Sequence, residues 1–359
     1  MQSIGIICEY NPFHNGHKYH IEQVKKIYPD AVIIAIMSGQ FVQRGEPAFI
    51  SKFIRTQMAL DFIDLVVELP QFYAVSYADD FARGGIKIAQ LLQLDALAFG
   101  SETGTLSFDK KIEIPDKTII RTGASYPKIM STGLKSNDIL AQSYLHAKDE
   151  LYPILHMIPI KRYGNEYLET HLTGTISSAT AIRKNYFEGE DITYVMPYAH
   201  LISHPVKWDN YFELLKYKII SSSVNELKSI YTMYEGLENR LKKVIGEVDT
   251  FEELIQSMVS KRYTKSRIQR LLTYILLNIR EIDVPHLKEI NAVRVLGMNN
   301  RGRNLIKNIK TTELITNVNK SNKHHFELEI KSTEIYNLIS GCRMTDFNTP
   351  VIYKNKEIN

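Results

Sequence analysis

The sequence predicts an α/β fold in which a doubly wound parallel sheet is followed by a mainly α-helical region. Short apolar runs alternate with amphipathic helical patterns over the first 160 residues. The apolar runs lack the strict period of two that half-exposed strands show, so both of their faces should be covered by helices. Beyond residue 208 long helical patterns dominate. Strands that alternate with helices are typical of a parallel sheet built from strand–helix–strand units.

The elements follow from these periods in chain order. The predicted strands of the first part are residues 4–8, 31–37, 64–69, 95–99 and 154–160. The predicted helices between them are residues 15–27, 52–63, 77–92 and 138–147. In the second part we expect helices at residues 211–220, 237–244 and 266–279, with short strand-like pieces at 292–296 and 313–315.

Length and charge indicate two domains. A chain of 359 residues exceeds what one compact core usually holds. The texture changes near residues 204–208, which divides the chain into residues 1–205 and 206–359. The first part has 19 Lys and Arg against 22 Asp and Glu, and the second has 25 against 18, so their net charges are −3 and +7. A basic second part is compatible with nucleic-acid binding and also with a solvated, lysine-rich surface.

Composition excludes several classes of protein. Hydrophobic residues make up 44% and charged residues 23% of the chain, which excludes disordered and fibrous proteins. The longest apolar run, residues 31–37, is too short to cross a membrane. The N-terminus lacks the basic region of a secretory signal, and two cysteines, Cys8 and Cys342, allow no disulfide framework. We therefore expect a cytoplasmic protein with no membrane partner.

The strongest functional signal is Glu9-Tyr-Asn-Pro-Phe-His14-Asn-Gly-His17, which follows the first strand and opens the first helix. A helix N-terminus attracts phosphate, and Gly16 would let a ligand approach the backbone closely. Two imidazoles three residues apart can each donate a hydrogen bond to phosphate oxygens. Simple helix capping is the alternative. Zinc binding that includes His20 is a weaker one, because no thiol or nearby carboxylate completes a tetrahedral set.

A second signal, residues 176–183, follows the fifth strand and begins another helix. The segment reads Ile-Ser-Ser-Ala-Thr-Ala-Ile-Arg. Its hydroxyl groups can cap the helix or face a triphosphate, and the sequence leaves both open. The candidate phosphate contacts are Ser177, Ser178, Thr180 and Arg183.

Both segments resemble the signatures of a known superfamily. The first resembles the HxGH motif of nucleotidyltransferases, which share a Rossmann-like fold with class I aminoacyl-tRNA synthetases. The second resembles their ISSTxIR motif, with one extra residue before the arginine. Residues 38–47 (SGQFVQRGEP), 99–102 (FGSE) and 296–303 (LGMNNRGR) narrow the resemblance to the tRNA(Met) cytidine acetate ligases, and it covers nearly the whole chain. Only the stretch from Thr103 to Lys135 is short and irregular for that family.

The resemblance implies a two-step reaction. Acetate and ATP would form acetyl adenylate and pyrophosphate, and the acetyl group would pass to the wobble cytidine of elongator tRNA(Met), giving acetylcytidine and AMP. A carboxylate is a poor acyl donor, so adenylation first supplies a leaving group. The implied partners are ATP, acetate and tRNA, without a stable protein partner. Mg²⁺ is expected with ATP, held mainly by the phosphates, and no protein metal ligands are predicted.

The family pattern also implies site residues. His14 and His17 would be catalytic, while Glu9 would at least orient the histidines. Asn137 could instead cap a helix, and Arg162 could be a surface cation. The residues implied to bind ATP are Ile7, Cys8, Glu9, Tyr10, Asn11, Pro12, Phe13, His14, Asn15, Gly16, His17, Lys18, Tyr19, His20, Gly100, Asn137 and Arg162.

Basic residues of the second part are the candidates for tRNA contact, and a solvated helix face is the alternative. They are Lys261, Arg262, Lys265, Arg267, Arg270, Arg301 and Arg303. Two other functions share part of the pattern. A small-metabolite adenylyltransferase, acting on phosphopantetheine or nicotinate mononucleotide, would need the HxGH motif but no basic second part. A non-catalytic RNA-binding protein would have no physical reason to keep both histidines.

Overall fold

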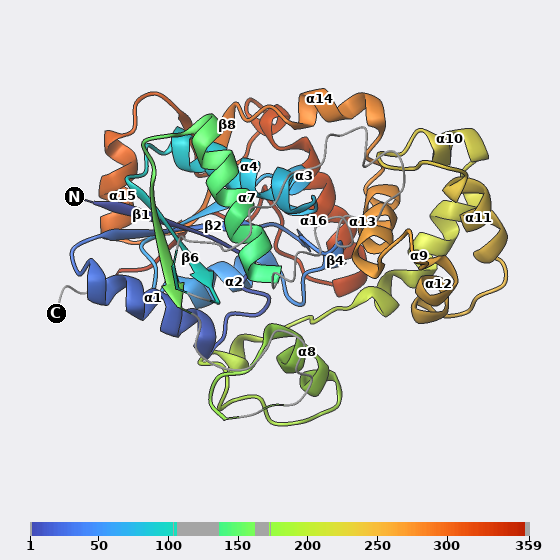
Figure 1. Ribbon diagram of the computed structural model, residues 1–359, viewed down its shortest axis with the longest axis horizontal. Helices are drawn as coiled ribbons and strands as arrows, with labels where there is room; N and C mark the ends of the chain where they lie inside the picture. Colours follow the sequence, from blue (N-terminus) through green and yellow to red (C-terminus); the bar gives the residue numbers. More distant parts are fainter. Residues whose placement is uncertain (1, 103, 106–135, 162–171, 173, 356–359) are drawn as a thin grey trace.

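A doubly wound sheet forms the centre of the protein (Figure 1). The computed structural model describes residues 2–102, 104–105, 136–161, 172 and 174–355. Five parallel strands run in the order β5-β2-β1-β6-β7, so β1 is central and successive strands are added first on one side and then on the other. Their bounds are β1 Ser3–Cys8, β2 Val32–Ser38, β5 Leu65–Leu69, β6 Ala96–Ser101 and β7 His156–Lys161.

Helices cover both faces of this sheet. Helices α1 (Asn15–Ile27) and α2 (Lys52–Ala59) share one buried cluster with Ile33 and Met37 of β2. On the other face, α4 (Ala78–Leu91) and α7 (Ser136–Leu151) share a second cluster with the alternate residues of β2. Between β1 and β6 the strand order reverses, and open α/β sheets bind ligands in the crevice at that point.

The five predicted strands are confirmed, with bounds shifted by one or two residues. Two predicted helices of the first part change length by more than two residues. The helix expected over residues 52–63 ends at Ala59, because the chain turns there to enter β5. The helix expected over 138–147 extends to Leu151, and its last turn is anchored by the ion pair between Arg83 and Glu150.

A late segment completes the sheet, which differs from the all-parallel expectation. Strand β8 (Ala292–Met298) pairs antiparallel with β5, and β9 (Glu313–Ile315) and β10 (Ile352–Tyr353) pair with β8. Every residue of β8 is buried, and a strand buried on both faces needs a sheet to join. Residues 292–353 therefore contribute strands to the sheet of the first part of the chain. The division into two domains at residue 205 stays a prediction.

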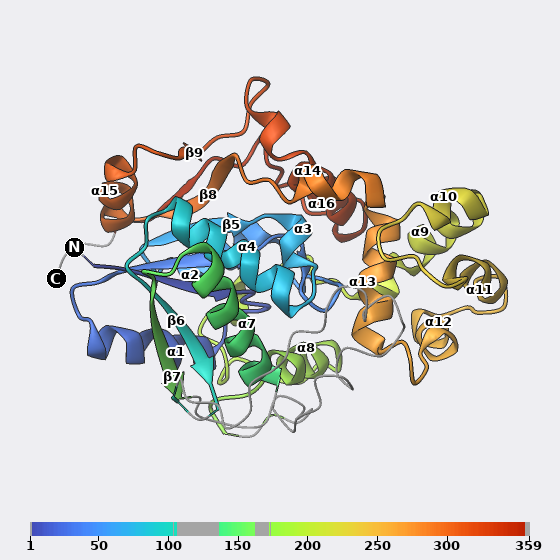
Figure 2. The same cartoon turned by 45° about the horizontal axis from the view of Figure 1, so that its top comes forward.

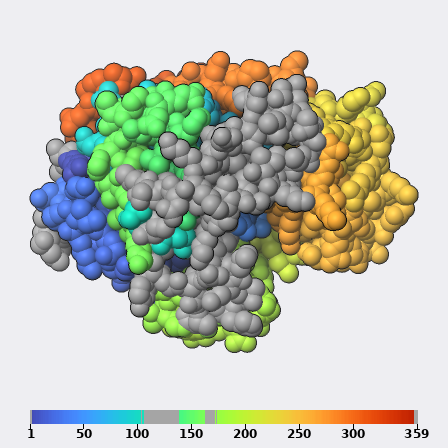
Figure 3. All heavy atoms as spheres, in the orientation of Figure 1, coloured from blue at the N-terminus to red at the C-terminus, as the bar shows by residue number. Residues whose placement is uncertain are grey.

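Helical elements between residues 208 and 287 form one end of the molecule (Figures 1–3). None of the helices in the described ranges has the length and apolar character needed to cross a bilayer. The helices of this region are α9 (Trp208–Ser221), α10 (Val224–Lys228), α11 (Leu237–Val244), α12 (Phe251–Met258), α13 (Lys265–Leu276) and α14 (Val284–Leu287).

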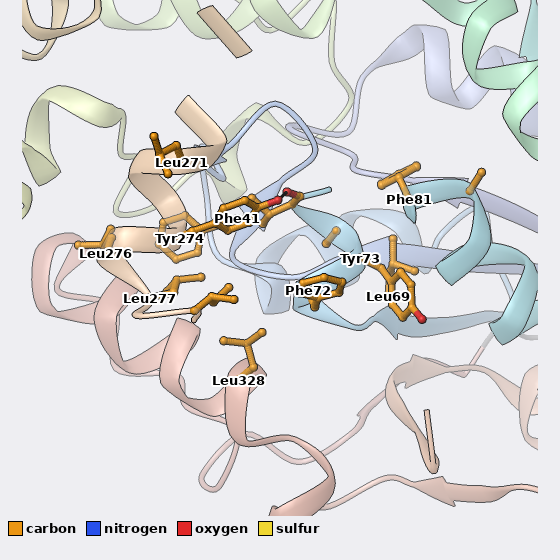
Figure 4. Close-up of a cluster of buried hydrophobic side chains, with 14 of the residues drawn as sticks. Phe41, Leu69, Phe72, Tyr73, Phe81, Leu271, Tyr274, Leu276, Leu277 and Leu328 are labelled. Atoms are coloured by element: carbon orange, nitrogen blue, oxygen red, sulfur yellow. Dashed lines mark hydrogen bonds between the residues drawn. The ribbon is translucent and has the colours of Figure 1, made fainter. Parts of the chain in front are cut away.

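Helix α13 is packed firmly against the sheet region. Leu271, Tyr274 and Leu277 belong to the same buried cluster as Phe41 and Phe72 (Figure 4). Phe41 lies in a short hairpin formed by β3 (Phe41–Val42) and β4 (Glu46–Pro47), and Phe72 lies in α3 (Gln71–Ala74). Because one continuous apolar core spans both parts of the chain, α13 has a fixed position relative to the strand ends.

Two late helices close the structure. Helix α15 (Asn300–Asn308) follows β8, and α16 (Glu327–Ser340) packs beside α3. A buried polar network joins α16 and the chain after it to the sheet. Lys52 Nζ lies 2.8 Å from Oε1 of Glu68 and 2.8 Å from Oδ1 of Asp346. The other carboxylate oxygen of Asp346, Oδ2, accepts from the Thr333 hydroxyl at 2.7 Å.

Glu329 of α16 is a buried carboxyl beside that network. Its Oε1 accepts the Gln71 backbone N–H at 2.7 Å. Burial, with a smaller contribution from the Glu68 charge, raises the pKa of Glu329 to about 7. The folded protein therefore binds a proton that the unfolded chain releases between pH 4.5 and 7, and the free energy of unfolding falls as pH rises through that window.

We predict that Glu329→Gln, which stays neutral at every pH, removes this slope. Relative to the wild type, the variant should gain on the order of 2–3 kcal/mol of unfolding free energy between pH 5 and pH 7.5. Urea unfolding at the two pH values measures the difference. An equal effect of the substitution at both pH values would show that Glu329 is already ionised at pH 5.

Candidate active site

The two histidines of the first motif are held by the beginning of α1. His14 caps the helix: its Nδ1 accepts the Gly16 N–H at 3.0 Å. Its own backbone N–H donates to Nδ1 of His17 at 3.3 Å, and the two ring centroids are 3.8 Å apart. Because each Nδ1 is an acceptor, each neutral ring has its proton on Nε2. Both imidazoles therefore offer an N–H donor for an anion.

Gly16 is required by the position of His14. A Cβ at residue 16 would lie 2.9 Å from Cε1 and 3.0 Å from Nδ1 of His14. Any side chain there would push the imidazole out of its capping position. The motif thus needs glycine between the histidines for a steric reason, which extends the backbone-approach argument made from the sequence.

The turns after β1 and β2 are fastened together by Arg55, a fully buried residue of α2. Its Nη1 donates to the carbonyl oxygens of Glu9 at 2.6 Å and Ser38 at 3.0 Å. Its Nε and Nη2 donate to the carbonyl oxygens of Ile50 and Gly39. Burial lowers the pKa of the Arg55 guanidinium to about 10, so it remains charged at neutral pH. One cation therefore positions both turns at the carboxyl edge of the sheet.

The second motif reaches the same place through α8 (Ala179–Phe187). Ser178 caps α8 by accepting the Ala181 N–H at 3.1 Å, so the capping interpretation is confirmed for this hydroxyl. Ser177 is buried, and its Oγ has no hydrogen-bond partner among the described residues. Arg183 donates to the Asn11 carbonyl oxygen at 2.8 Å and lies 3.3 Å from a carboxylate oxygen of Glu46.

These segments surround a cavity of about 830 Å³, a volume that suits a nucleotide with a second substrate. Its walls come from the carboxyl ends of β1, β6 and β7, the β3–β4 hairpin, the first turns of α4, α7 and α8, and the beginning of α13. The sheet supplies the switch-point crevice, and α13 closes one side of it. Both halves of the chain therefore contribute residues to the wall of this cavity.

Most of the residues predicted to bind ATP line this cavity. Gly100 does, as do all four candidate phosphate contacts. Asn137 is the second residue of α7, and Arg162 lies outside the described residues. The cavity is lined, within residues 7–20, by Ile7, Cys8, Glu9, Tyr10, Asn11, His14, Gly16, His17, Tyr19 and His20.

Four residues of the predicted segment do not line the cavity. Phe13 is fully buried and stacks on Phe62 with centroids 5.1 Å apart. The Asn15 side chain donates to two backbone carbonyl oxygens, and Lys18 pairs with Glu22 along α1. The fourth residue is Pro12, whose peptide bond with Asn11 is cis.

Several lining residues were absent from the sequence prediction. Gln43, Arg44 and Glu46 come from residues 38–47, which the sequence identified only as a family motif, and Tyr77 precedes α4. Lys161 ends β7. Each of these residues follows the carboxyl end of a predicted strand. That position was the signal in the sequence that could have identified them as lining residues.

Cys8 is not poised for nucleophilic chemistry. Burial raises the pKa of the Cys8 thiol, so it stays protonated and cannot act as a thiolate. Burial likewise raises the pKa of Glu9, whose Oε1 accepts the Gln43 N–H at 2.9 Å. The described residues contain no cluster of three His, Cys, Asp or Glu side chains arranged to hold a metal ion.

The candidate RNA-binding residues separate into different environments. Lys261, Arg262 and Lys265 are exposed near the beginning of α13, and the latter two line the cavity. Arg267 and Arg270 also line it but are buried, so they are not part of the exposed basic surface.

Arg301 and Arg303 lie elsewhere. The antiparallel direction of β8 places the helix that follows it, α15, at the amino edge of the parallel strands. Arg301 donates there to the carbonyl oxygens of Asp30 and Ala31, just before β2. The glycine of this motif lets α15 pack closely against the backbone at Asp64. A Cβ at Gly302 would lie 2.1 Å from the Asp64 carbonyl oxygen. Arg301 and Arg303 therefore lie at the opposite edge of the sheet from the cavity, and their contact with tRNA stays a prediction.

A helix-capping histidine pair at the switch point of a doubly wound sheet defines a nucleotidyltransferase site, and the comparisons agree. A model of the HIGH Nucleotidyl Transferase family matches residues 1–348. Within that class the chain belongs to the tRNA(Met) cytidine acetate ligase family. It is 44% identical to the tRNA(Met) cytidine acetate ligase of Staphylococcus carnosus, covering 99% of this chain and 100% of that protein. It is also 44% identical to the Staphylococcus aureus (strain MRSA252) enzyme, covering 98% and 99%.

Solved structures give the same result. The apo crystal structure of Thermotoga maritima TmcAL superposes with a TM-score of 0.89 at 27% identity, covering 99% of this chain and 100% of that one. The structure of the same protein bound with alpha-thio ATP has a TM-score of 0.87 at 26% identity, with the same coverage.

We predict that His17→Ala lowers the rate of ATP-dependent turnover by about a hundredfold or more, because it removes a donor aimed at developing phosphate charge. His286→Ala, which changes an exposed histidine on α14, is the matched control and should retain wild-type rates. Steady-state rates at saturating substrate measure both. A His17→Ala rate equal to that of the control would contradict the catalytic assignment.

Proposed function

We propose that the protein is an ATP-dependent acetate ligase that acetylates the wobble cytidine of elongator tRNA(Met). One observation supports this most directly. The imidazoles of His14 and His17 line the same cavity as the basic beginning of α13. A nucleotide-activating site and a polynucleotide-binding element therefore share one space, which a small-metabolite adenylyltransferase would not require.

In the first step the cavity would bind ATP with its phosphates near the beginnings of α1 and α8. The Nε2–H donors of His14 and His17 and the buried Ser177 hydroxyl would contact phosphate oxygens. An acetate oxygen would attack the alpha phosphate and pyrophosphate would leave. Donors that strengthen as charge moves to the leaving group lower the barrier of this step.

Further ATP contacts would come from the strand ends. Gly100 leaves room for the adenosine at the end of β6. Asn137 and Arg162 retain their proposed roles as ATP contacts. Mg²⁺ would accompany ATP and be held mainly by phosphate oxygens.

In the second step the exocyclic amine of the cytidine would attack the acetyl carbonyl and AMP would leave. An anticodon loop can turn a base outward at low energetic cost, which brings the amine into the cavity. Exposed Lys261, Arg262 and Lys265 would contact the phosphates that flank the loop. The protein would act in the cytoplasm without a stable protein partner.

The direct test incubates the protein with ATP, labelled acetate and unmodified elongator tRNA(Met), and then digests the RNA for nucleoside analysis. We expect labelled acetylcytidine at the wobble position and stoichiometric AMP. Unlabelled RNA, together with pyrophosphate release on addition of phosphopantetheine or nicotinate mononucleotide, would show the alternative adenylyltransferase activity instead.

We predict that changing Lys261, Arg262 and Lys265 together to Glu weakens tRNA binding by a hundredfold or more at physiological salt, because each contributes to phosphate neutralisation. ATP binding should stay within about twofold of the wild type. Filter binding of tRNA and calorimetry with an ATP analogue measure the two quantities. The same change at Lys228, Lys242 and Lys243, on α10 and α11, is the control. Equal tRNA affinity in both triple variants would contradict the assignment.

A further inference from the structure

Helix α13 presents two buried arginines to the catalytic cavity. Arg270 is 6% exposed and Arg267 is 8% exposed, and neither forms an ion pair with a described residue. The outward cations of the same region are paired: Arg262 with Glu235, and Lys265 with Glu252 at 3.5 Å. Burying a cation without a counter-charge is costly. An anion that enters the cavity would offset this cost.

The Arg270 guanidinium is fixed in position before any ligand binds. Nη1 donates to the Gln43 carbonyl oxygen at 3.3 Å, and the Tyr77 ring centroid lies 4.1 Å from Cζ. The Arg270 backbone also packs closely against the hairpin, since a Cβ at Gly45 would lie 2.3 Å from the Arg270 nitrogen. The Arg270 Nε is buried and has no hydrogen-bond partner among the described residues, so this N–H can donate to a ligand.

The identity of the anion follows from size and from what else the cavity binds. The ATP phosphates are assigned to the beginnings of α1 and α8. RNA phosphates are attached to a bulky backbone and would meet the exposed cations near the beginning of α13 first. A small planar carboxylate matches a buried guanidinium in shape and charge. We infer that Arg270 binds the carboxylate of acetate during the adenylation step, an inference that rests on the proposed function.

Arg270 would also solve an electrostatic problem. The Glu46 carboxyl lines the cavity, and the phosphates of bound ATP add negative charge. A second anion enters such a site only beside a cation. With one acetate oxygen held by Arg270, the other attacks the alpha phosphorus. The new O–P bond forms as the bond between the alpha phosphorus and the oxygen that bridges it to the beta phosphorus breaks. The electron pair of the broken bond leaves with pyrophosphate. The acetyl group is then uncharged, so Arg270 no longer retains it.

The test uses full-length Arg270→Gln and Arg270→Lys. Initial rates of acetylcytidine formation are measured against acetate at saturating ATP and tRNA, and the KM values for ATP and tRNA are measured separately. We expect the KM for acetate to rise roughly 10- to 100-fold in Arg270→Gln, the range for a lost charge-assisted hydrogen bond. Arg270→Lys, which keeps the charge, should show a smaller rise. The KM values for ATP and tRNA should stay within about twofold.

Lys228→Gln is the matched control, since it removes one exposed positive charge from α10. An unchanged KM for acetate in both Arg270 variants would overturn the inference. A rise confined to the KM for ATP or for tRNA would overturn it as well, because Arg270 would then serve those phosphates. If Arg270→Gln unfolds, Arg270→Lys decides alone. Failure of the proposed function is distinct: the wild type itself would form no acetylcytidine.

Discussion

The site depends on a buried cation that binds backbone. Arg55 lies inside the protein and donates to the carbonyl oxygens of Glu9, Ser38, Gly39 and Ile50. Carbonyl groups at the ends of parallel strands would otherwise face a poorly solvated crevice, where an unpaired acceptor is costly. One guanidinium satisfies several of them at once. Because it joins the turns after β1 and β2, the histidine pair and the β3–β4 hairpin have fixed positions relative to each other.

The β3–β4 hairpin also connects these turns to the helical half of the chain. Its Gly45 carbonyl oxygen accepts hydrogen bonds from the Trp208 indole at 2.7 Å and from the Thr273 hydroxyl at 3.0 Å. The apolar cluster around Phe41 continues into α13. The wall that carries Arg270 is therefore as rigid as the sheet, and the second substrate can be positioned against ATP without closure of a domain.

Much of the fold was predictable because its signals are local. Continuous apolar runs identified the five parallel strands, and the HxGH and serine-rich motifs identified the beginnings of α1 and α8. The place of β8 was not predictable, since pairing with β5 depends on contacts between residues more than 200 positions apart. The position of Arg301 and Arg303 was not predictable for the same reason: strand direction, which the sequence does not show, places α15 at the opposite edge of the sheet.

Charge shows the same division between sequence and structure. The sequence alone determined that basic residues concentrate in the second part and that His14, Gly16 and His17 form the turn that begins α1, because motif spacing and helix capping are properties of neighbouring residues. Only the tertiary structure decided which cations meet that turn. Lys265 and Arg270 belong to the same helix, yet one is exposed and the other is buried in the cavity wall. Burial depends on what packs against each face of α13, and distant segments supply those neighbours.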